Sequence, residues 1–187
     1  MKRKLLNDDV DTCLKSLGLR FGQETADSFQ SEWHDTDVDL SAGTPIEQIM
    51  SVALLYVLKS KAHFGYCGDY IICGSAKNGI RPPQREGFIV CPQARVGKYR
   101  ADFFVGYRHF DGTVISAAIE CDGHEFHEKT KKQAQRDKER DRFFQSLGLL
   151  VLRYSGSEIF HDPVKCASDA LRIIYDRAEA SREGRDA

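Results

Sequence analysis

The chain contains two apolar runs separated by a short polar turn, and this arrangement leaves few folds open to it. Residues 99–107 (YRADFFVGY) and 113–121 (TVISAAIEC) are rich in aromatic and β-branched side chains, and Asp111-Gly112 lies between them. The pattern predicts two antiparallel strands joined as a hairpin. Because side chains alternate along a strand, we expect the first strand to place Arg100, Asp102 and Phe104 on one face and Tyr99, Ala101, Phe103 and Val105 on the other.

Carboxylates occupy the middle and the end of this predicted hairpin. Asp102 lies mid-strand among apolar neighbours, and Glu120 and Asp122 alternate with Cys121 so that they share a face. A carboxylate inside a sheet costs free energy unless it is paired or bound to a metal ion. If the hairpin pairs as expected, Asp102 and Glu120 can converge on one cation, and their oxygen atoms suit Mg²⁺ or Mn²⁺.

The remaining elements complete an α/β pattern. Strands are expected over residues 70–73, 88–91 and 149–154. Helices are expected over residues 44–62, 130–147 and 157–177, the last interrupted or restarted near Pro163. The order helix, strands, hairpin, helix, strand, helix predicts a mixed β-sheet covered by helices on both faces.

The first predicted helix begins with a clear capping signal. Thr44 is a good N-cap, Pro45 fits the first helical position, and Glu47 completes a capping box. Glu47 also falls at the flank of the apolar stripe that faces the sheet, so its carboxylate could join those of Asp102 and Glu120. Two roles are open for Glu47, a helix cap and a member of the carboxylate cluster.

The helix over residues 130–147 has an apolar stripe that becomes polar toward its N-terminus. The polar part of that face consists of Gln133, Arg136, Asp137 and Arg140, and the apolar part of Phe143, Phe144 and Leu147. This pattern predicts that the N-terminal half of the helix looks into a polar cleft beside Glu120. The alternative is a buried salt-bridge cluster, such as Arg136 with Asp137 or Arg140 with Glu120.

The formal net charge of −1 conceals strongly charged blocks. Residues 109–128 hold five acidic side chains and no Lys or Arg, whereas residues 81–108 and 129–142 each carry a net charge of +4. A carboxylate-rich stretch between two basic ones suits a metal site beside phosphates, although the second basic block is also compatible with a solvated helix face. The near-neutral total excludes a globally basic nucleic-acid binder.

The length of 187 residues suits one domain with short flanking segments. We expect an acidic N-terminal segment over residues 1–40, a compact domain over 41–178 and a polar tail over 179–187. No apolar run reaches the roughly 18 to 20 residues of a membrane span, and no signal region follows the basic start. Six scattered cysteines without a CxxC pair indicate reduced thiols, so a cytoplasmic protein with no membrane partner is expected.

Several of these motifs occur in an order that resembles a known group of enzymes. The run YRADFFV is followed by ExDG with a nearby His, then by RDxxRD and VLRY. This set resembles the PD-(D/E)XK nuclease superfamily and, within it, the branch of very-short-patch-repair-like endonuclease domains, over about residues 44–177. The resemblance implies a restriction-endonuclease-like fold and Mg²⁺-dependent hydrolysis of DNA phosphodiesters, in a repair, restriction or mobile-element context.

The resemblance also assigns roles to individual residues. Asp102 and Glu120 match the motif carboxylates that bind the metal ion, and Glu47 matches the helix Glu that often completes the site. The Lys of the superfamily's third motif position falls on Asp122, which becomes a further metal ligand. The substitute for that Lys would come from His124, His127, Lys129 or Gln133. In the implied mechanism His127 or His124 shuttles a proton, and the residues that hold DNA are Arg100, Lys129, Gln133, Arg136 and Arg140.

Two alternatives of other functional classes stay open at this point. One is a catalytically inactive nuclease fold that serves as a DNA-binding or assembly module. The other is a zinc-binding module built on Cys121, His124 and His127, whose C-x2-H-x2-H spacing could contribute to a Zn²⁺ site. The sequence leaves DNA and RNA open as substrates, and it allows a homodimer or a partner protein that supplies specificity.

Overall fold

The structure, a computed structural model, describes residues 43–60, 69–72, 85–123 and 131–183. Its centre is a five-stranded mixed sheet in the order β1-β2-β3-β4-β5. The strands are β1 (Asp69–Ile72), β2 (Gly87–Val96), β3 (Tyr99–Arg108), β4 (Val114–Asp122) and β5 (Leu150–Ser155). β2, β3 and β4 form an antiparallel meander, whereas β1 pairs in parallel with β2 and β5 in parallel with β4.

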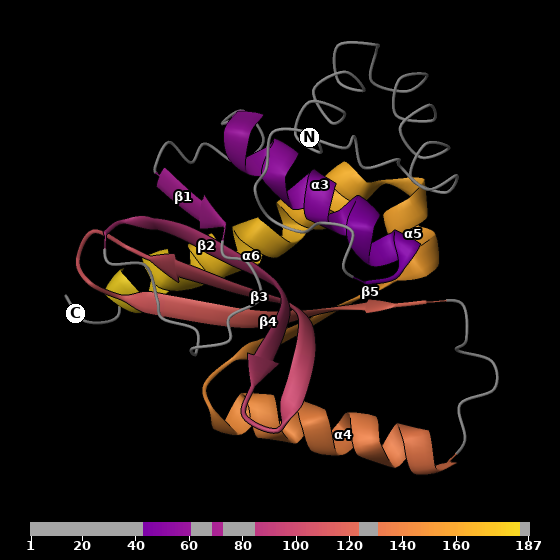
Figure 1. The fold of residues 1–187 in the computed structure, drawn as a ribbon. Helices are drawn as coiled ribbons and strands as arrows, with labels where there is room; N and C mark the ends of the chain where they lie inside the picture. The colour runs from indigo at the N-terminus through magenta and orange to yellow at the C-terminus, as the bar shows by residue number, and fades with distance from the viewer. Residues whose placement is uncertain (1–42, 61–68, 73–84, 124–130, 184–187) are drawn as a thin grey trace, which may run out of the picture.

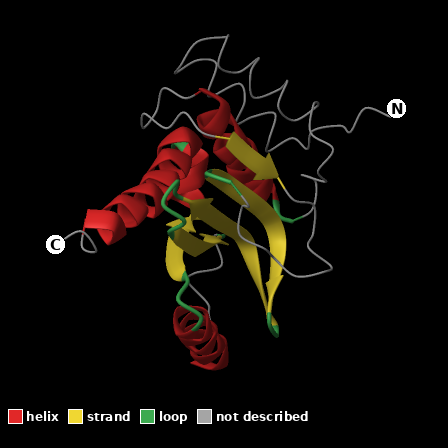
Figure 2. Ribbon diagram, turned by 90° about the vertical axis from the view of Figure 1, so that its left-hand side faces the viewer, coloured by secondary structure: helices red, strands yellow, loops and turns green. Residues whose placement is uncertain are grey.

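Helices cover both faces of this sheet. One layer contains α3 (Pro45–Ser60), α5 (Gly156–His161) and α6 (Pro163–Glu183), and α4 (Lys131–Ser146) lies on the opposite side (Figure 1). Figure 2 shows the sheet between the two layers from a second direction. The predicted α/β architecture, a restriction-endonuclease-like mixed sheet flanked by helices on both faces, is therefore confirmed. None of the described helices is both long and apolar enough to cross a membrane.

Each helical layer packs on its own hydrophobic core. The larger core joins α3 and α6 to the sheet, and the smaller one packs Phe144 of α4 and Leu149 against β2, β3 and β4. Leu147, predicted to belong to the α4 packing stripe, is instead 55% exposed because the helix ends at Ser146. The turn that follows contains Gly148 in a left-handed conformation, which is the usual way for a helix to end.

Strands β2 and β3 do not keep a regular alternation along their whole length. Phe103 packs in the larger core and Phe104 in the smaller one, as alternation requires, but Ala101 packs beside Phe104 in the smaller core. The prediction that Ala101 and Phe103 share a face is therefore wrong. The alternation lapses at Asp102, and the end of the β2–β3 hairpin beyond it packs on α4, where the ring of Tyr99 lies 5.3 Å from that of Phe143.

The C-terminal helices follow the predicted break. Ser155 caps α5, and its side chain accepts from the Glu158 backbone N–H while the Glu158 carboxylate accepts from the Ser155 N–H, a complete capping box. A new helix, α6, begins at Pro163 and runs to Glu183, past the predicted start of the polar tail at residue 179. The predicted acidic segment over residues 1–40 lies outside the described residues.

Candidate active site

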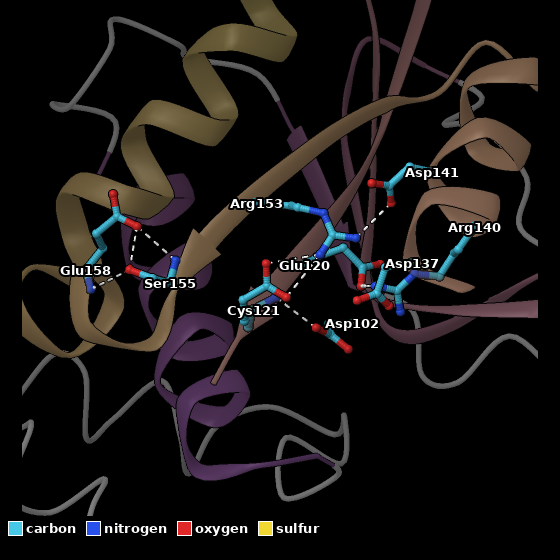
Figure 3. Close-up of polar contacts among 10 residues, drawn as sticks. Asp102, Glu120, Cys121, Asp137, Arg140, Asp141, Arg153, Ser155 and Glu158 are labelled. Atoms are coloured by element: carbon cyan, nitrogen blue, oxygen red, sulfur yellow. Dashed lines mark hydrogen bonds and ion pairs between the residues drawn. The ribbon is translucent and has the colours of Figure 1, made fainter. Parts of the chain in front are cut away.

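The candidate site lies where β3 and β4 separate. Their ladder ends at the pair Phe103 and Ile119. Asp102 is the next residue of β3 beyond that pair, and its Oδ2 accepts from the backbone N–H of Cys121 on β4 at 2.8 Å (Figure 3). The Asp102 carboxylate thus replaces a backbone acceptor at the end of the ladder. This position places Asp102 between the two strands, where groups from both helical layers can reach it.

Glu120 lies beside Asp102 and belongs to the side of the sheet that faces α4. Its side chain is 2% exposed, and Oε2 pairs with a guanidinium nitrogen of Arg140 at 2.8 Å. Arg140 also approaches Asp137 of the same helix at 3.7 Å. The ion pair of Arg140 with Glu120, which the sequence left open as the alternative to a polar cleft, is therefore present. Oε1 of Glu120 is buried and has no hydrogen-bond partner among the described residues.

Glu47 reaches the site from the other helical layer. The Thr44 hydroxyl accepts from the Glu47 backbone N–H at 3.5 Å and donates to Glu47 Oε1 at 3.0 Å, so Thr44 caps the helix as predicted. The second oxygen, Oε2, accepts from the side-chain amide of Gln93 on β2. Glu47 is buried, and its carboxylate also accepts from the backbone N–H of Thr44, so the predicted capping box is present.

The ionisation of the three carboxylates reflects their mutual proximity. Burial raises the pKa of Glu47, and the charge of Asp102 raises it further. Burial, together with the charge of Asp102, raises the pKa of Glu120 to about 8 against the opposing effect of Arg140. Burial also raises the pKa of Asp102, although the Cys121 N–H lowers it. The three acids are close enough to repel one another.

Asp122 has a different environment from the other acids. One nitrogen of Arg153 donates to both Asp122 oxygens at 3.0 Å, and the other donates to Asp141 of α4 at 2.8 Å. Arg153 lies opposite Glu120 in the β4–β5 register. It links two strands to α4 (Figure 3) and places a cation beside the predicted metal ligands.

The predicted DNA-binding residues are only partly gathered at the site. Arg100 is exposed on β3, and its charge lowers the pKa values of Glu47 and Asp102, so it lies near both. Gln133 and Arg136 are exposed on α4, and among the described residues of that helix only Arg140 pairs with Glu120. His124, His127 and Lys129, and with them most of the predicted zinc motif, lie outside the described residues.

The residues at the split between the strands fit a hard divalent cation in their donor chemistry. Within the described ranges, no three His, Cys, Asp or Glu side chains are already grouped as a metal site. Asp102 and Glu120 nevertheless supply oxygen atoms only, the ligand type that Mg²⁺ and Mn²⁺ prefer. A cation bound there would satisfy the unpaired Glu120 oxygen and offset the repulsion between the acids.

One of the comparisons with known proteins gave a match. The family model REase_MTES_1575, of a restriction-endonuclease-like family, matches residues 83–174, just under half of the chain. The matched region includes Asp102, Glu120, Arg140 and Arg153. It supports a restriction-endonuclease-like domain and a nuclease-type function. No curated protein and no solved structure matched the chain.

Sequence reasoning gave no role to two residues of the site, Gln93 and Arg153. Arg153 is a charged residue inside an apolar strand, and the argument that singled out Asp102 would have singled it out as well. The sequence signal for Gln93 was weaker, because a single Gln after Pro92 belongs to no periodic pattern of polar and apolar residues. Its place became visible only in the fold, which brings it opposite Asp102.

Proposed function

We propose that this protein is a Mg²⁺- or Mn²⁺-dependent endonuclease that hydrolyses phosphodiester bonds of DNA. The observation that supports the proposal is that Asp102 lies close enough to both Glu47 and Glu120 to raise the pKa of each, while one Glu120 oxygen is buried without a partner among the described residues. The family match over residues 83–174 supports a nuclease-type activity in the same region.

In this proposal Asp102 and Glu120 hold the cation, and Glu47 adds negative charge from the α3 side. When bound, the cation polarises the phosphoryl oxygen and lowers the pKa of the attacking water. The Cys121 N–H fixes the orientation of Asp102, and Arg140 fixes that of Glu120. Arg153 pairs with Asp122, and in this proposal Asp122 supports the site through that ion pair rather than as a ligand of the cation.

The end of the β2–β3 hairpin provides the surface for the nucleic-acid backbone. Arg95 and Arg100 lie directly opposite each other in the ladder, and both are exposed. Like charges in that position destabilise a sheet, so an anion between or beside them is favoured. Lys98 adds a third exposed cation in the turn. We infer that these side chains hold phosphates that flank the bond to be cut.

Cleavage of DNA by the full chain tests the proposal. Duplex, single-stranded, mismatched and branched DNA, with RNA in parallel, are incubated with Mg²⁺ or Mn²⁺ and with a chelator. We expect metal-dependent cleavage by the wild type and a loss of at least about 100-fold in Asp102→Asn and Glu120→Gln, because each removes a charged ligand. The control Asp176→Asn changes an exposed acid of α6 and should cleave normally.

Two outcomes would contradict the proposal. Full activity in both ligand variants would remove Asp102 and Glu120 from the chemistry. Binding of DNA without cleavage of any substrate under either metal would favour the inactive DNA-binding or assembly module instead.

A further inference from the structure

Gln93 occupies a backbone conformation that its residue type rarely adopts. Its φ angle is 51°, and among the described residues it is the only one other than glycine with a positive φ. It does so inside strand β2, where neighbouring residues are extended. Side chains larger than Asn are uncommon in the left-handed region, and such residues persist where the surroundings fix them, often at functional sites.

The unusual backbone coincides with the lapse in strand alternation. Cys91 and Ala94 both pack in the smaller core, although strict alternation would place them on opposite faces. The ladder pairs Pro92 with Phe103 and Ala94 with Ala101, so Gln93 lies opposite Asp102 between these two pairs. The β2–β3 ladder is therefore interrupted at Gln93 and Asp102, and Asp102 is a proposed metal ligand.

The side chain of Gln93 makes one specific contact, through its amide nitrogen to Glu47 Oε2. The same space is closed from the helix side by Gly43. A Cβ atom on Gly43 would collide with Glu47 Oε2 and would lie 3.1 Å from the Gln93 amide nitrogen. The Glu47 carboxylate is thus held between the Thr44 hydroxyl, the Gly43 backbone and the Gln93 amide.

We propose that Gln93 is a positioning residue that holds the Glu47 carboxylate toward Asp102 without neutralising it. A neutral amide donates a hydrogen bond and leaves the carboxylate its full charge for a cation, whereas a Lys or Arg at this position would compete with the cation. This inference rests on the proposed function, because a fixed, charged Glu47 matters only if the site binds a metal ion.

The test uses the full chain and reverses the polarity of the contact. Gln93→Glu removes the amide donor and places two carboxylates against each other. Glu47→Gln places two amides against each other. The double variant Gln93→Glu/Glu47→Gln restores one amide and one carboxylate, with their positions exchanged. We expect Gln93→Glu to lower the folding equilibrium constant of the metal-free protein about tenfold and the double variant to recover most of that loss. The Mn²⁺ dissociation constant, measured by calorimetry, should rise about tenfold in Gln93→Glu and in the double variant.

Two further variants separate the backbone from the amide. Gln93→Asn suits the left-handed backbone but is too short to reach Glu47, so we expect stability to be kept while Mn²⁺ affinity and cleavage fall. Gln135→Glu is the matched control, because Gln135 donates to Glu139 at 3.1 Å on the exposed face of α4. It should change none of these quantities by more than about twofold.

Additive stability effects in the cycle would show that Gln93 and Glu47 are not coupled and would overturn the inference. If the wild type binds Mn²⁺, an equal Mn²⁺ affinity in Gln93→Asn would also overturn the inference. If the wild type binds no Mn²⁺ and cleaves nothing, the proposed function fails, and the stability cycle alone decides whether Gln93 positions Glu47.

Discussion

At the scale of single residues, the site is a set of acids whose charges are only partly compensated. Glu120 has one oxygen paired with Arg140 and the other buried without a partner among the described residues. Asp102 is held by one backbone N–H, and Glu47 by the hydroxyl and backbone N–H of Thr44 and by an amide. This degree of compensation keeps the fold intact while leaving negative charge that a divalent cation can use.

The raised pKa of Glu120 makes the stability of the metal-free protein depend on pH. Its pKa of about 8 in the folded state lies above the ordinary value of 4.5, so the folded chain binds this proton more tightly than the unfolded chain does. The associated stability is fully present below about pH 4.5 and is lost as pH rises toward 8. The loss should be on the order of a few kcal/mol.

Urea unfolding with a chelator present, at several pH values in that window, measures this dependence. We expect the slope of unfolding free energy against pH to be clearly shallower in Glu120→Gln than in the wild type. Glu139→Gln, an exposed change on α4, should keep the wild-type slope. Identical slopes in all three proteins would show that Glu120 ionises normally.

At the scale of elements, Arg153 ties three of them together. It reaches Asp122 on β4 and Asp141 on α4 from β5, and it is partly buried. Since α4 also contacts the sheet through the smaller core and through the Arg140–Glu120 pair, this ion-pair bridge adds a second polar link between α4 and the sheet. Removing part of the bridge leaves a carboxylate without its partner, which costs more than the pair itself contributes.

We therefore expect Arg153→Lys to destabilise the protein by about 1–3 kcal/mol, because Lys lacks the planar fork that serves both acids. Arg177→Lys, an exposed change on α6, should be neutral within about 0.5 kcal/mol. Chemical denaturation of both variants provides the measurement. Equal stability of Arg153→Lys and the wild type would mean that the bridge has no energetic role.

The elements themselves were largely predictable from the sequence, and the site was predictable only in part. Apolar alternation and the Asp-Gly turn were enough to place β3 and β4, and Pro163 does separate two helices. The carboxylates Asp102 and Glu120 stood out because charge inside a strand is costly. The bend at Gln93 did not stand out, since it depends on a left-handed residue and on contacts with α3 and α4 that are distant in sequence.

At the scale of the whole molecule, the charge that suits nucleic acid is concentrated at one end of the sheet. Arg95, Lys98 and Arg100 are exposed around the β2–β3 turn, near the carboxylates. The total charge of the chain is −1, so the proposed binding of DNA would depend on local basic groups such as this one rather than on the overall field.

The double variant Arg95→Gln/Lys98→Gln should weaken DNA binding at all sequences and make it less dependent on salt. Each lost phosphate contact lowers the slope of log affinity against log salt by about 0.9. Lys165→Gln/Arg177→Gln removes the same charge from exposed positions on α6. Titrations at several salt concentrations should show a shallower slope for the hairpin variant only, and parallel slopes would argue for a different DNA-binding surface.

The order of the elements along the chain has a consequence for biosynthesis. β2, β3 and β4 follow one another directly, whereas Glu47 and Arg153 come from elements far apart in sequence. Hairpins close short loops and form early, and contacts of long sequence separation form later. Asp102 and Glu120 come together with the β3–β4 hairpin, whereas Glu47 joins them only when α3 packs on α6 and the sheet. We therefore expect a chain still leaving the ribosome to form its hairpins before the carboxylate site is complete, so that the proposed nuclease activity would arise only with the last step of folding.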